Sequence, residues 1–154
     1  MTLADLLNTQ TVSRDLDGGE RDDVLRAMLD RLASSGKVAA STLGALHAAL
    51  VAREDLGSTA IGRGVAVPHA RTDEVDGLVA AFGYCPAGVE FNSLDGQPVH
   101  HIFLLLGPMG AADEYTDTIQ RITHLVQNED FCRFVTQARS DAEVLDLIAE
   151  MEAV

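Results

Sequence analysis

Residues 53–71 read Arg-Glu-Asp-Leu-Gly-Ser-Thr-Ala-Ile-Gly-Arg-Gly-Val-Ala-Val-Pro-His-Ala-Arg, the one stretch of the chain where glycines, arginines and a histidine gather. The three glycines between positions 57 and 64 predict a loop. Residues 65–67 then predict a short strand, which Pro68 ends because proline has no N–H to continue a ladder. His69 is therefore expected at the end of a strand, beside a glycine-lined pocket.

The side chains of this stretch suit an anion such as phosphate. Ser58 and Thr59 carry hydroxyl donors, and the backbone N–H groups around them can form an anion-binding nest. Arginines make bidentate contacts to phosphate, and the stretch holds Arg53, Arg63 and Arg71. A neutral histidine whose N–H is held in a hydrogen bond exposes its other ring nitrogen, so His69 is the predicted nucleophile.

Most of these residues also have a purely structural interpretation. Arg53 follows a predicted helix, where a cation complements the helix dipole. The hydroxyls of Ser58 and Thr59 can instead satisfy backbone groups of the turn. Arg63 and Arg71 are expected to be surface charges. From the residues alone, phosphate binding and turn formation both remain open for the serine and the threonine.

Outward from this stretch, hydrophobic periodicity alternates between helical and strand spacing. The predicted helices cover residues 3–7, 20–34, 42–52, 113–127, 130–138 and 140–151. The predicted strands cover residues 11–16, 65–67, 78–84 and 99–106. Ser41 or Thr42 is the expected cap of the helix over 42–52, and Ser140 with Glu143 forms a capping box. This alternation predicts a single α/β domain over residues 1–154, with a helix-covered sheet.

Composition limits the classes of partner. Of the 154 residues, 11 are Lys or Arg and 24 are Asp or Glu, which gives a formal net charge of −13. Residues 53–71 carry +1, with three arginines against two carboxylates, and the rest of the chain carries −14. Because nucleic-acid binding and attraction to anionic membranes both require cations, neither partner is expected. The acidic N-terminus and the short apolar runs predict no signal peptide, no membrane insertion and a cytoplasmic location.

The remaining histidines and the cysteines form no metal-binding pattern. His100 and His101 are adjacent, and neighbouring residues of a strand point to opposite faces of the sheet. His47 is expected to pack beside a helix and His124 to be exposed to solvent. Cys85 and Cys132 are expected to be small core residues without a disulfide. We therefore expect neither a metal nor another cofactor.

The stretch resembles the active-site signature of the EIIA domains of the bacterial phosphoenolpyruvate-dependent phosphotransferase system, in their fructose, mannitol and nitrogen type. The resemblance is carried by Arg-Glu-x-Leu-Gly-Ser-Thr at 53–59 and Ile-Gly-x-Gly-Val-Ala-Val-Pro-His-Ala at 61–70. It extends to Gly-Gln-Pro-Val at 96–99, Phe-Leu-Leu-Leu at 103–106 and Ser-Asp-x-Glu at 140–143. It implies a mixed sheet of roughly five strands flanked by helices on both faces.

The resemblance also implies an activity. His69 would accept a phosphoryl group from an HPr-like phosphocarrier, which makes the chain a protein-histidine phosphotransferase. The group would pass to an enzyme IIB or act as a signal to regulatory target proteins. The Gly-Ser-Thr run at 57–59 is closer to the nitrogen type.

One residue departs from the family pattern. The helix after the last core strand usually begins Glu-His, and that second histidine packs beside the phosphoacceptor, whereas Tyr115 follows Glu114 here. A phenol can donate a hydrogen bond but is no cation at neutral pH, so we expect slow or altered transfer. The alternative is a binding module that reads its own phosphorylation state with little onward transfer. A Ser/His hydrolase is disfavoured because no nucleophile elbow surrounds Ser58.

Overall fold

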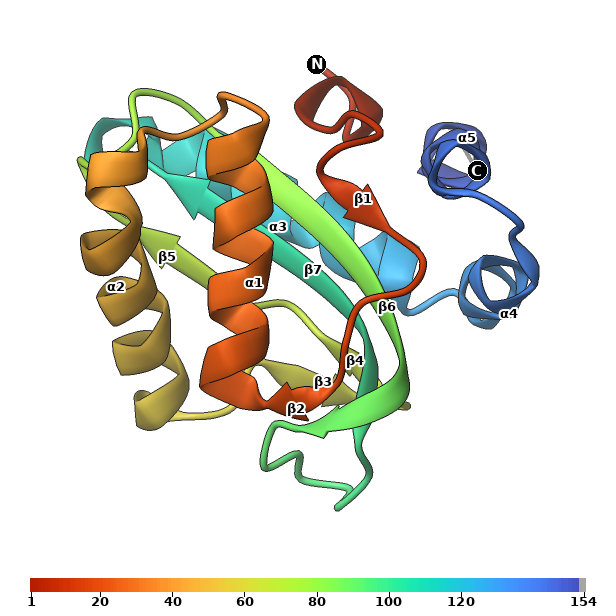
Figure 1. Ribbon diagram of the computed structural model, residues 1–154. Coiled ribbons are helices and arrows are strands. Elements are labelled where there is room, and N and C mark those ends of the chain that lie inside the picture. Colours follow the sequence, from red (N-terminus) through yellow and green to blue (C-terminus); the bar gives the residue numbers. More distant parts are fainter. Residues whose placement is uncertain (153–154) are drawn as a thin grey trace.

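The computed structural model describes residues 1–152 and shows a mixed sheet with helices on both faces (Figure 1). At its centre, β6 (Val79–Glu90) and β7 (Val99–Gly107) run antiparallel. Phe82 and Phe103 pair across these strands and face one helical layer, whereas Ile102 faces the other. Both central strands are rich in apolar residues, as expected for strands that are covered on both sides.

Four short strands pair with the outer edges of β6 and β7, and a fifth extends the sheet beyond them. β1 (Val12–Ser13) and β2 (Gly19–Glu20) run parallel to β6. β4 (Val65–Ala66) and β5 (His69–Arg71) run parallel to β7, and β3 (Ala60–Gly62) pairs antiparallel with β4. The sheet thus has seven strands where roughly five are expected, because β1 and β2 share one edge and β4 and β5 share another. The path β1-β6-β7-β4-β3 still has five positions.

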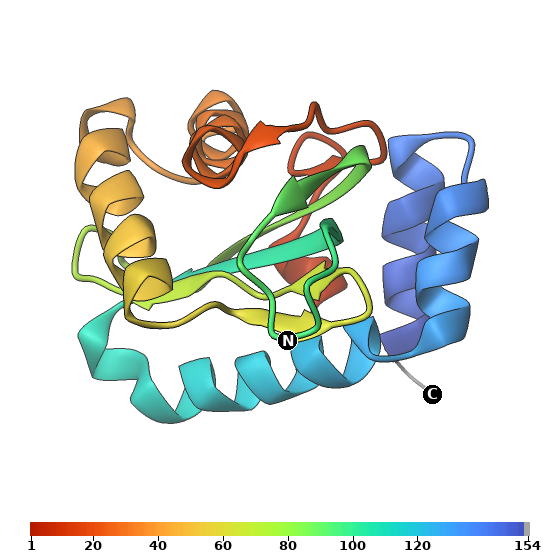
Figure 2. The same cartoon turned by 90° about the horizontal axis from the view of Figure 1, so that it is seen from below.

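Helices cover the two faces in the way that the alternating sequence pattern predicts. On one face lie α1 (Arg21–Ser34) and α2 (Leu43–Leu56), and on the other lies α3 (Ala112–Val126) (Figure 2). α4 (Glu129–Gln137) and α5 (Asp141–Glu152) pack together on the side of β1. The short 3₁₀ helices are η1 (Ala4–Leu6), η2 (Ala40–Thr42) and η3 (Met109–Ala111). The predicted α/β fold class is confirmed.

Two hydrophobic cores hold these layers to the sheet. Leu29 and Leu50 belong to the core under α1 and α2 and are fully buried. Ile122, Phe131 and Ile148 belong to the core under α3, α4 and α5 and are also fully buried. Each such side chain contributes about 1.5–3 kcal/mol through removal from water. The sheet is therefore packed on both faces, which gives the strands that carry the candidate site a rigid support.

β6 continues past the residues expected to end it. The sequence predicts that this strand ends at Tyr84, before Pro86, but the strand runs to Glu90. The ladder to β7 shifts between Tyr84 and Val89, and β1 and β2 contact β6 only at residues 82–83 and 89–90. Pro86 thus lies where neither neighbouring strand needs its missing N–H. The His100 ring lies beside this interruption, with its Nδ1 2.9 Å from the carbonyl oxygen of Cys85.

Helix ends differ from the predictions in two places. α2 continues to Leu56 rather than ending near residue 52, so Arg53 lies inside the helix. Thr42 does not cap α2, since its hydroxyl donates to the carbonyl of Ala39 in the preceding turn, at 2.6 Å. The last helix follows its prediction more closely, because Ser140 Oγ accepts from the Glu143 N–H at 3.1 Å. The Glu143 carboxylate bonds the N–H of Arg139 rather than that of Ser140, so only half of the capping box forms.

Candidate active site

His69 is the first residue of β5 and is half-buried. The prediction placed it at the end of the strand over 65–67, but pairing with β7 resumes after the proline. The Pro68 carbonyl accepts the Leu105 N–H at 3.0 Å, and His69 then stands opposite Leu105 in the β5–β7 register. Parallel pairing on both sides of Pro68 therefore fixes the backbone that carries the imidazole.

The two ring nitrogens of His69 have different environments. Nδ1 lies 2.6 Å from the carbonyl oxygen of Val67. A carbonyl can only accept, so Nδ1 carries the proton and donates it to Val67. Within residues 1–152, no protein group bonds to Nε2. The neutral ring with its proton on Nδ1 therefore presents a free lone pair on Nε2, which is the form that a nucleophilic imidazole requires.

Tyr115, near the start of α3, packs against this imidazole. The centroids of the two rings are 6.2 Å apart, with an angle of 58° between the ring planes. The tyrosine is only 6% exposed. Burial raises the pKa of its phenol to about 12, although Arg71 and, more weakly, Arg53 oppose the shift. At neutral pH, Tyr115 is therefore an uncharged hydrogen-bonding group beside His69.

Arg71, expected to be a surface charge, lies beside Tyr115. It is exposed, but its Cζ lies 5.9 Å from the centroid of the Tyr115 ring. Its Nη2 donates to the carbonyl oxygen of Met109, in η3, at 2.5 Å. His69 and Arg71 are two residues apart on one strand and so point to the same face. This alternation was visible in the sequence and would have placed the arginine beside the histidine.

Arg53 and Arg63 have different surroundings. Arg53, in the last turn of α2, donates from Nη1 to the carbonyl of Gly57 at 2.7 Å. Its charge lowers the pKa of the Tyr115 phenol, more weakly than that of Arg71. Its contacts thus fit both the predicted helix-end role and a place at the site. Arg63 is exposed and pairs with Glu129 at 2.7 Å, so its predicted surface role is confirmed.

Ser58 and Thr59 use their polar groups within the protein. The Ser58 hydroxyl donates to the carbonyl of Phe91 at 2.7 Å and accepts from the Ala60 N–H at 3.0 Å. Thr59 donates its N–H to Oε2 of Glu54 at 3.0 Å and its hydroxyl to the other carboxylate oxygen. These contacts follow the turn interpretation rather than the anion-binding nest, because the Thr59 donors are already paired with an internal carboxylate.

Two glycines of the glycine-rich loop shape the β3–β4 hairpin. Arg63 and Gly64 both have positive φ, of 58° and 77°, as a tight turn between β3 and β4 requires. Gly62 lines a cavity of about 410 Å³ with residues of β3, β4 and the end of α3, and His69 does not line it. Gly62 and Gly64 thus shape a hairpin farther along the strand, and a glycine-lined pocket around His69 stays a prediction.

The other histidines and the cysteines lie away from this site or serve packing. His47 Nε2 contacts the carbonyl of Asp22 at 2.8 Å, and His124 is exposed, as predicted. His101 is buried against Tyr84, and neither of its ring nitrogens has a hydrogen-bond partner within the described residues. Both cysteines are free, with Cys85 buried and Cys132 partly buried.

Residues 1–152 offer no metal centre and no membrane span. No three histidine, cysteine or carboxylate side chains of this range gather as metal ligands would. No helix in it is long and apolar enough to cross a bilayer. The candidate site is thus one imidazole with a free ring nitrogen, a neutral phenol beside it and Arg71 against that phenol.

The sequence of residues 5–151 matches the family described as phosphoenolpyruvate-dependent sugar phosphotransferase system, EIIA 2. The chain belongs to this family. Among EIIA-containing relatives, the fructose-specific EIIABC component of Bacillus subtilis is 32% identical over 148 residues, which are 96% of this chain but 23% of that protein. The nitrogen regulatory protein of Bradyrhizobium diazoefficiens is 30% identical over 124 residues, 80% of this chain and 81% of that one.

The EIIA fold is also found among solved structures. The nitrogen regulatory protein IIA-Ntr of Neisseria meningitidis superimposes with a TM-score of 0.86 at 26% identity. The match covers 95% of this chain and 98% of that one. Family membership thus rests on both sequence and fold, and it includes both fructose-specific and nitrogen regulatory relatives.

Proposed function

We propose that this chain is a phosphohistidine relay protein that accepts a phosphoryl group on Nε2 of His69. The observation that carries the proposal is the 2.6 Å contact from Nδ1 to the Val67 carbonyl, which leaves Nε2 as the free nitrogen. The half-buried position of the ring adds to this, since a phosphocarrier must reach the nitrogen. The donor is an HPr-like phosphocarrier, as family membership suggests.

The transfer is a direct exchange between two imidazoles. The Nε2 lone pair of His69 forms a new N–P bond while the N–P bond of the donor phosphohistidine breaks. The electron pair of the broken bond returns to the donor nitrogen, and the phosphoryl group carries its oxygens and charge with it. The ring of His69 gains positive charge in this step while keeping the proton on Nδ1. The Val67 carbonyl stabilises that charge, because it accepts the proton's hydrogen bond throughout.

Arg53 and Arg71 are the cations proposed to face the phosphoryl oxygens. Negative charge at this group is stabilised by positioned donors that need no rearrangement during the reaction. Arg71 is held by the Met109 carbonyl and the Tyr115 ring, and Arg53 by the Gly57 carbonyl. Tyr115 contributes a neutral hydroxyl donor rather than a charge. Ser58 and Thr59 are assigned to the turn rather than to phosphate.

The acceptor after His69 defines two candidate roles. Onward transfer to an enzyme IIB corresponds to a sugar-specific component, whereas binding of target proteins corresponds to a nitrogen-type regulator. The Gly-Ser-Thr run and the nitrogen regulatory relatives favour the nitrogen type. A specific observation also favours the second candidate, a regulatory binding module with little onward transfer. The buried Tyr115 supplies no cation where fast transfer would use one.

The first experiment incubates the protein with phosphoenolpyruvate, the first enzyme of the relay and an HPr-like carrier. We expect an acid-labile, alkali-stable phosphate on the wild type and none on His69→Ala. His124→Ala, which removes an exposed histidine from α3, is the matched control and should label like the wild type. Equal labelling of His69→Ala and the wild type would contradict the proposal.

The second experiment separates the two roles. Protein labelled on His69 is mixed with a sugar-specific enzyme IIB, and the label is followed on both proteins. Transfer of the label identifies a carrier. Retention of the label on His69 identifies the regulator, whose binding to target proteins should then differ between the phosphorylated and unphosphorylated forms.

A further inference from the structure

Glu54 is a buried carboxylate that the proposed transfer does not use. It lies in the last turn of α2 and is only 3% exposed. Both of its oxygens accept hydrogen bonds from Thr59: Oε2 from the N–H at 3.0 Å and Oε1 from the hydroxyl. Burying a carboxylate is costly unless its oxygens are hydrogen-bonded. Both hydrogen-bond donors of Thr59 thus hold the buried Glu54 carboxylate in place.

Backbone hydrogen bonds lead from this pair to the imidazole. The Thr59 carbonyl accepts the N–H of Val67 at 3.1 Å. The carbonyl of Val67 in turn accepts the proton on Nδ1 of His69 at 2.6 Å. Thr59 is 5% exposed and Val67 is 3% exposed, so water has little access to compete for these bonds. Glu54 and His69 are therefore linked through only two intervening residues, all in contact.

We propose that Glu54 is a positioning residue for His69, acting through Thr59 and Val67. The proposal rests on the proposed function, since it concerns how the acceptor nitrogen is kept available. The Glu54 carboxylate holds Thr59 in place, and the Thr59 carbonyl holds the Val67 N–H. Because the backbone of Val67 is fixed in this way, the direction of its carbonyl is fixed as well. That carbonyl selects the tautomer with the proton on Nδ1. Hydrogen bonds in such a chain also strengthen one another through polarisation.

Loss of the carboxylate would free the Thr59 end of the chain. The Val67 carbonyl would then point less constantly at the ring, and His69 would populate the tautomer with its proton on Nε2. That tautomer has no lone pair on the accessible nitrogen and cannot accept phosphorus there. The role of Glu54 is thus exerted without any contact to the phosphoryl group.

The kinetic experiment compares phosphoryl transfer from an HPr-like carrier among variants. Glu54→Ala should lower the rate constant by about ten- to a hundredfold, as loss of a group that orients a reacting residue does. Thr59→Val, which keeps the shape and the N–H but removes the hydroxyl, should lower it less, and Thr59→Ser should restore it. Glu152→Gln and Thr11→Val are the matched controls. They change a carboxylate and a hydroxyl that are also well shielded and bonded to backbone groups, but near η1 rather than the site.

A second measurement reports the tautomer itself. ¹⁵N NMR of the histidine ring in the unphosphorylated protein should show the proton on Nδ1 of His69 in the wild type. Glu54→Ala should show a mixture of both tautomers.

If the variants fold, by circular dichroism, but keep both the wild-type tautomer and the wild-type rate, the positioning role is wrong. If Glu54→Ala does not fold, the Thr59→Val and Thr59→Ser pair decides by the same two criteria. Failure of the wild type to label would overturn the relay instead, because the tautomer measurement needs no phosphate.

Discussion

Charge at the candidate site comes from its arginines and not from the group next to the histidine. The phenol of Tyr115, whose pKa burial raises to about 12, stays neutral through the physiological range. A histidine at that position would be partly protonated near neutral pH and could add a positive charge. The identity of one side chain therefore decides whether the phosphoryl group meets two positive charges or three.

Replacing this tyrosine tests that difference. Tyr115→His should speed phosphoryl transfer from an HPr-like carrier about 5- to 150-fold, the equivalent of a charge-assisted contact of about 1–3 kcal/mol. The measurement is the single-turnover labelling rate at pH 6.5, where the new imidazole is partly protonated. Tyr115→Phe is the companion variant, since it keeps the ring under Arg71 and removes only the hydroxyl. An unchanged rate in Tyr115→His would show that the missing cation does not limit transfer.

Arg71, which lies beside Tyr115, should contribute more to the rate of phosphoryl transfer than Arg63 does. Arg71→Gln removes a guanidinium that is held against Tyr115 and Met109, and we expect transfer to slow about tenfold or more. Arg63→Gln removes an exposed guanidinium paired with Glu129 and should transfer at the wild-type rate. Both rates are read from the same labelling assay. Equal losses in the two variants would mean that only the overall charge of the segment counts.

At the scale of elements, hydrophobic periodicity predicted the long helices and the central strands, and failed where a strand is interrupted and resumes. Pro68 lacks an N–H, which suggests an end, yet its carbonyl still pairs and β5 begins at the next residue. Pro86 lies in β6 for a related reason, since the neighbouring strands leave a gap there. Local sequence reports which hydrogen bonds a residue can make. It does not report which ones its neighbours require.

The candidate site also has parts that the sequence predicts and parts that it does not. His69, Arg53 and Tyr115 could be proposed from the sequence because their residue types fit a known spacing. The pairing of Thr59 with Glu54 was missed because it depends on the turn between α2 and β3, which sequence spacing does not specify. Arg71 is exposed as expected, and strand alternation also places it on the face of His69. Residue types at the spacing of a known motif thus pointed to side chains on three different elements, whereas the Thr59–Glu54 contact depends on the geometry of one turn and was not accessible from sequence.

The stability of the protein should be sensitive to added side-chain volume where the β6–β7 ladder shifts, between Tyr84 and Val89. Gly88 has a φ of +82°, and a Cβ there would lie 3.0 Å from His100 Cε1 and 3.1 Å from Pro98 Cβ. We expect Gly88→Ala to lose about 2–4 kcal/mol of stability, from left-handed backbone strain and from the contact. Gly96→Ala, at a φ of +70° with open space around it, should lose only the strain, about 1–2 kcal/mol. Urea unfolding of both variants measures the difference, and equal losses would exclude a contribution from His100.

His101 on β7 should make stability depend on pH. Burial lowers its pKa below the usual 6.5, and the adjacent His100 acts in the same direction. Below pH 6.5 the unfolded chain therefore binds a proton that the native chain refuses, so the free energy of unfolding falls as the pH decreases. The loss has a slope of at most about 1.4 kcal/mol per pH unit until the native ring also protonates.

Urea unfolding between pH 7.5 and pH 5 measures this slope. His101→Leu, which places an apolar side chain among the same neighbours, should flatten the dependence. His124→Ala, from an exposed position, should leave it unchanged. A slope that persists in His101→Leu would assign the effect to another group.

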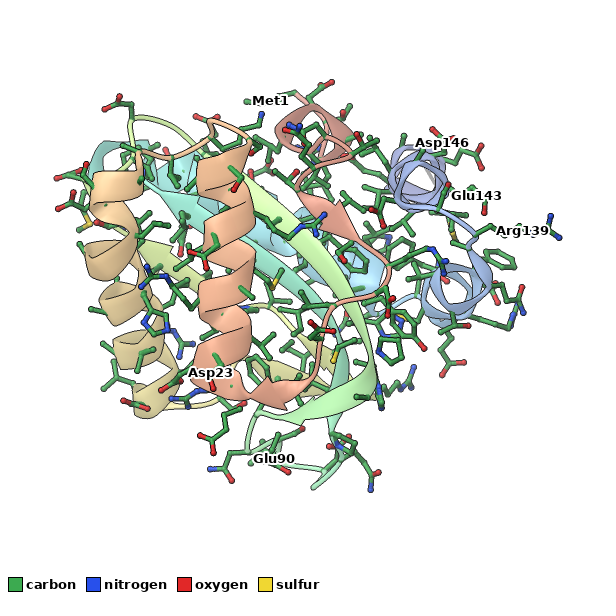
Figure 3. The ribbon with its side chains drawn as sticks, viewed as in Figure 1. Met1, Asp23, Glu90, Arg139, Glu143 and Asp146 are labelled. Carbon is green, nitrogen blue, oxygen red and sulfur yellow. The ribbon has the colours of Figure 1, made fainter. Side chains whose placement is uncertain are left out.

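For the molecule as a whole, charge is distributed unevenly around the candidate site. Residues 53–71 sum to +1 within a chain of −13, and one of the two acids in that segment, Glu54, is buried and paired. Acidic side chains such as Asp23, Glu90, Glu143 and Asp146 instead project from the outer surfaces of the molecule (Figure 3). α5 and β5 lie on opposite sides of the molecule in Figure 1, so the most acidic helix is remote from His69. A partner approaching the site thus meets local cations inside a wider negative field.

This arrangement predicts how ionic strength controls docking. A phosphocarrier with a basic face should be drawn to the acidic body and its phosphoryl group to Arg53 and Arg71, so association should be fast at low salt. Raising the salt from 0.1 M to 1 M shortens the screening length from about 10 Å to about 3 Å, and the association rate constant should fall about tenfold or more. Stopped-flow mixing with a labelled HPr-like carrier measures it, with unfolding at both salt concentrations as the control for stability. Because the attraction acts over distances longer than any contact, dissociation should change much less than association. An association rate that is independent of salt would mean that shape alone guides the carrier to His69.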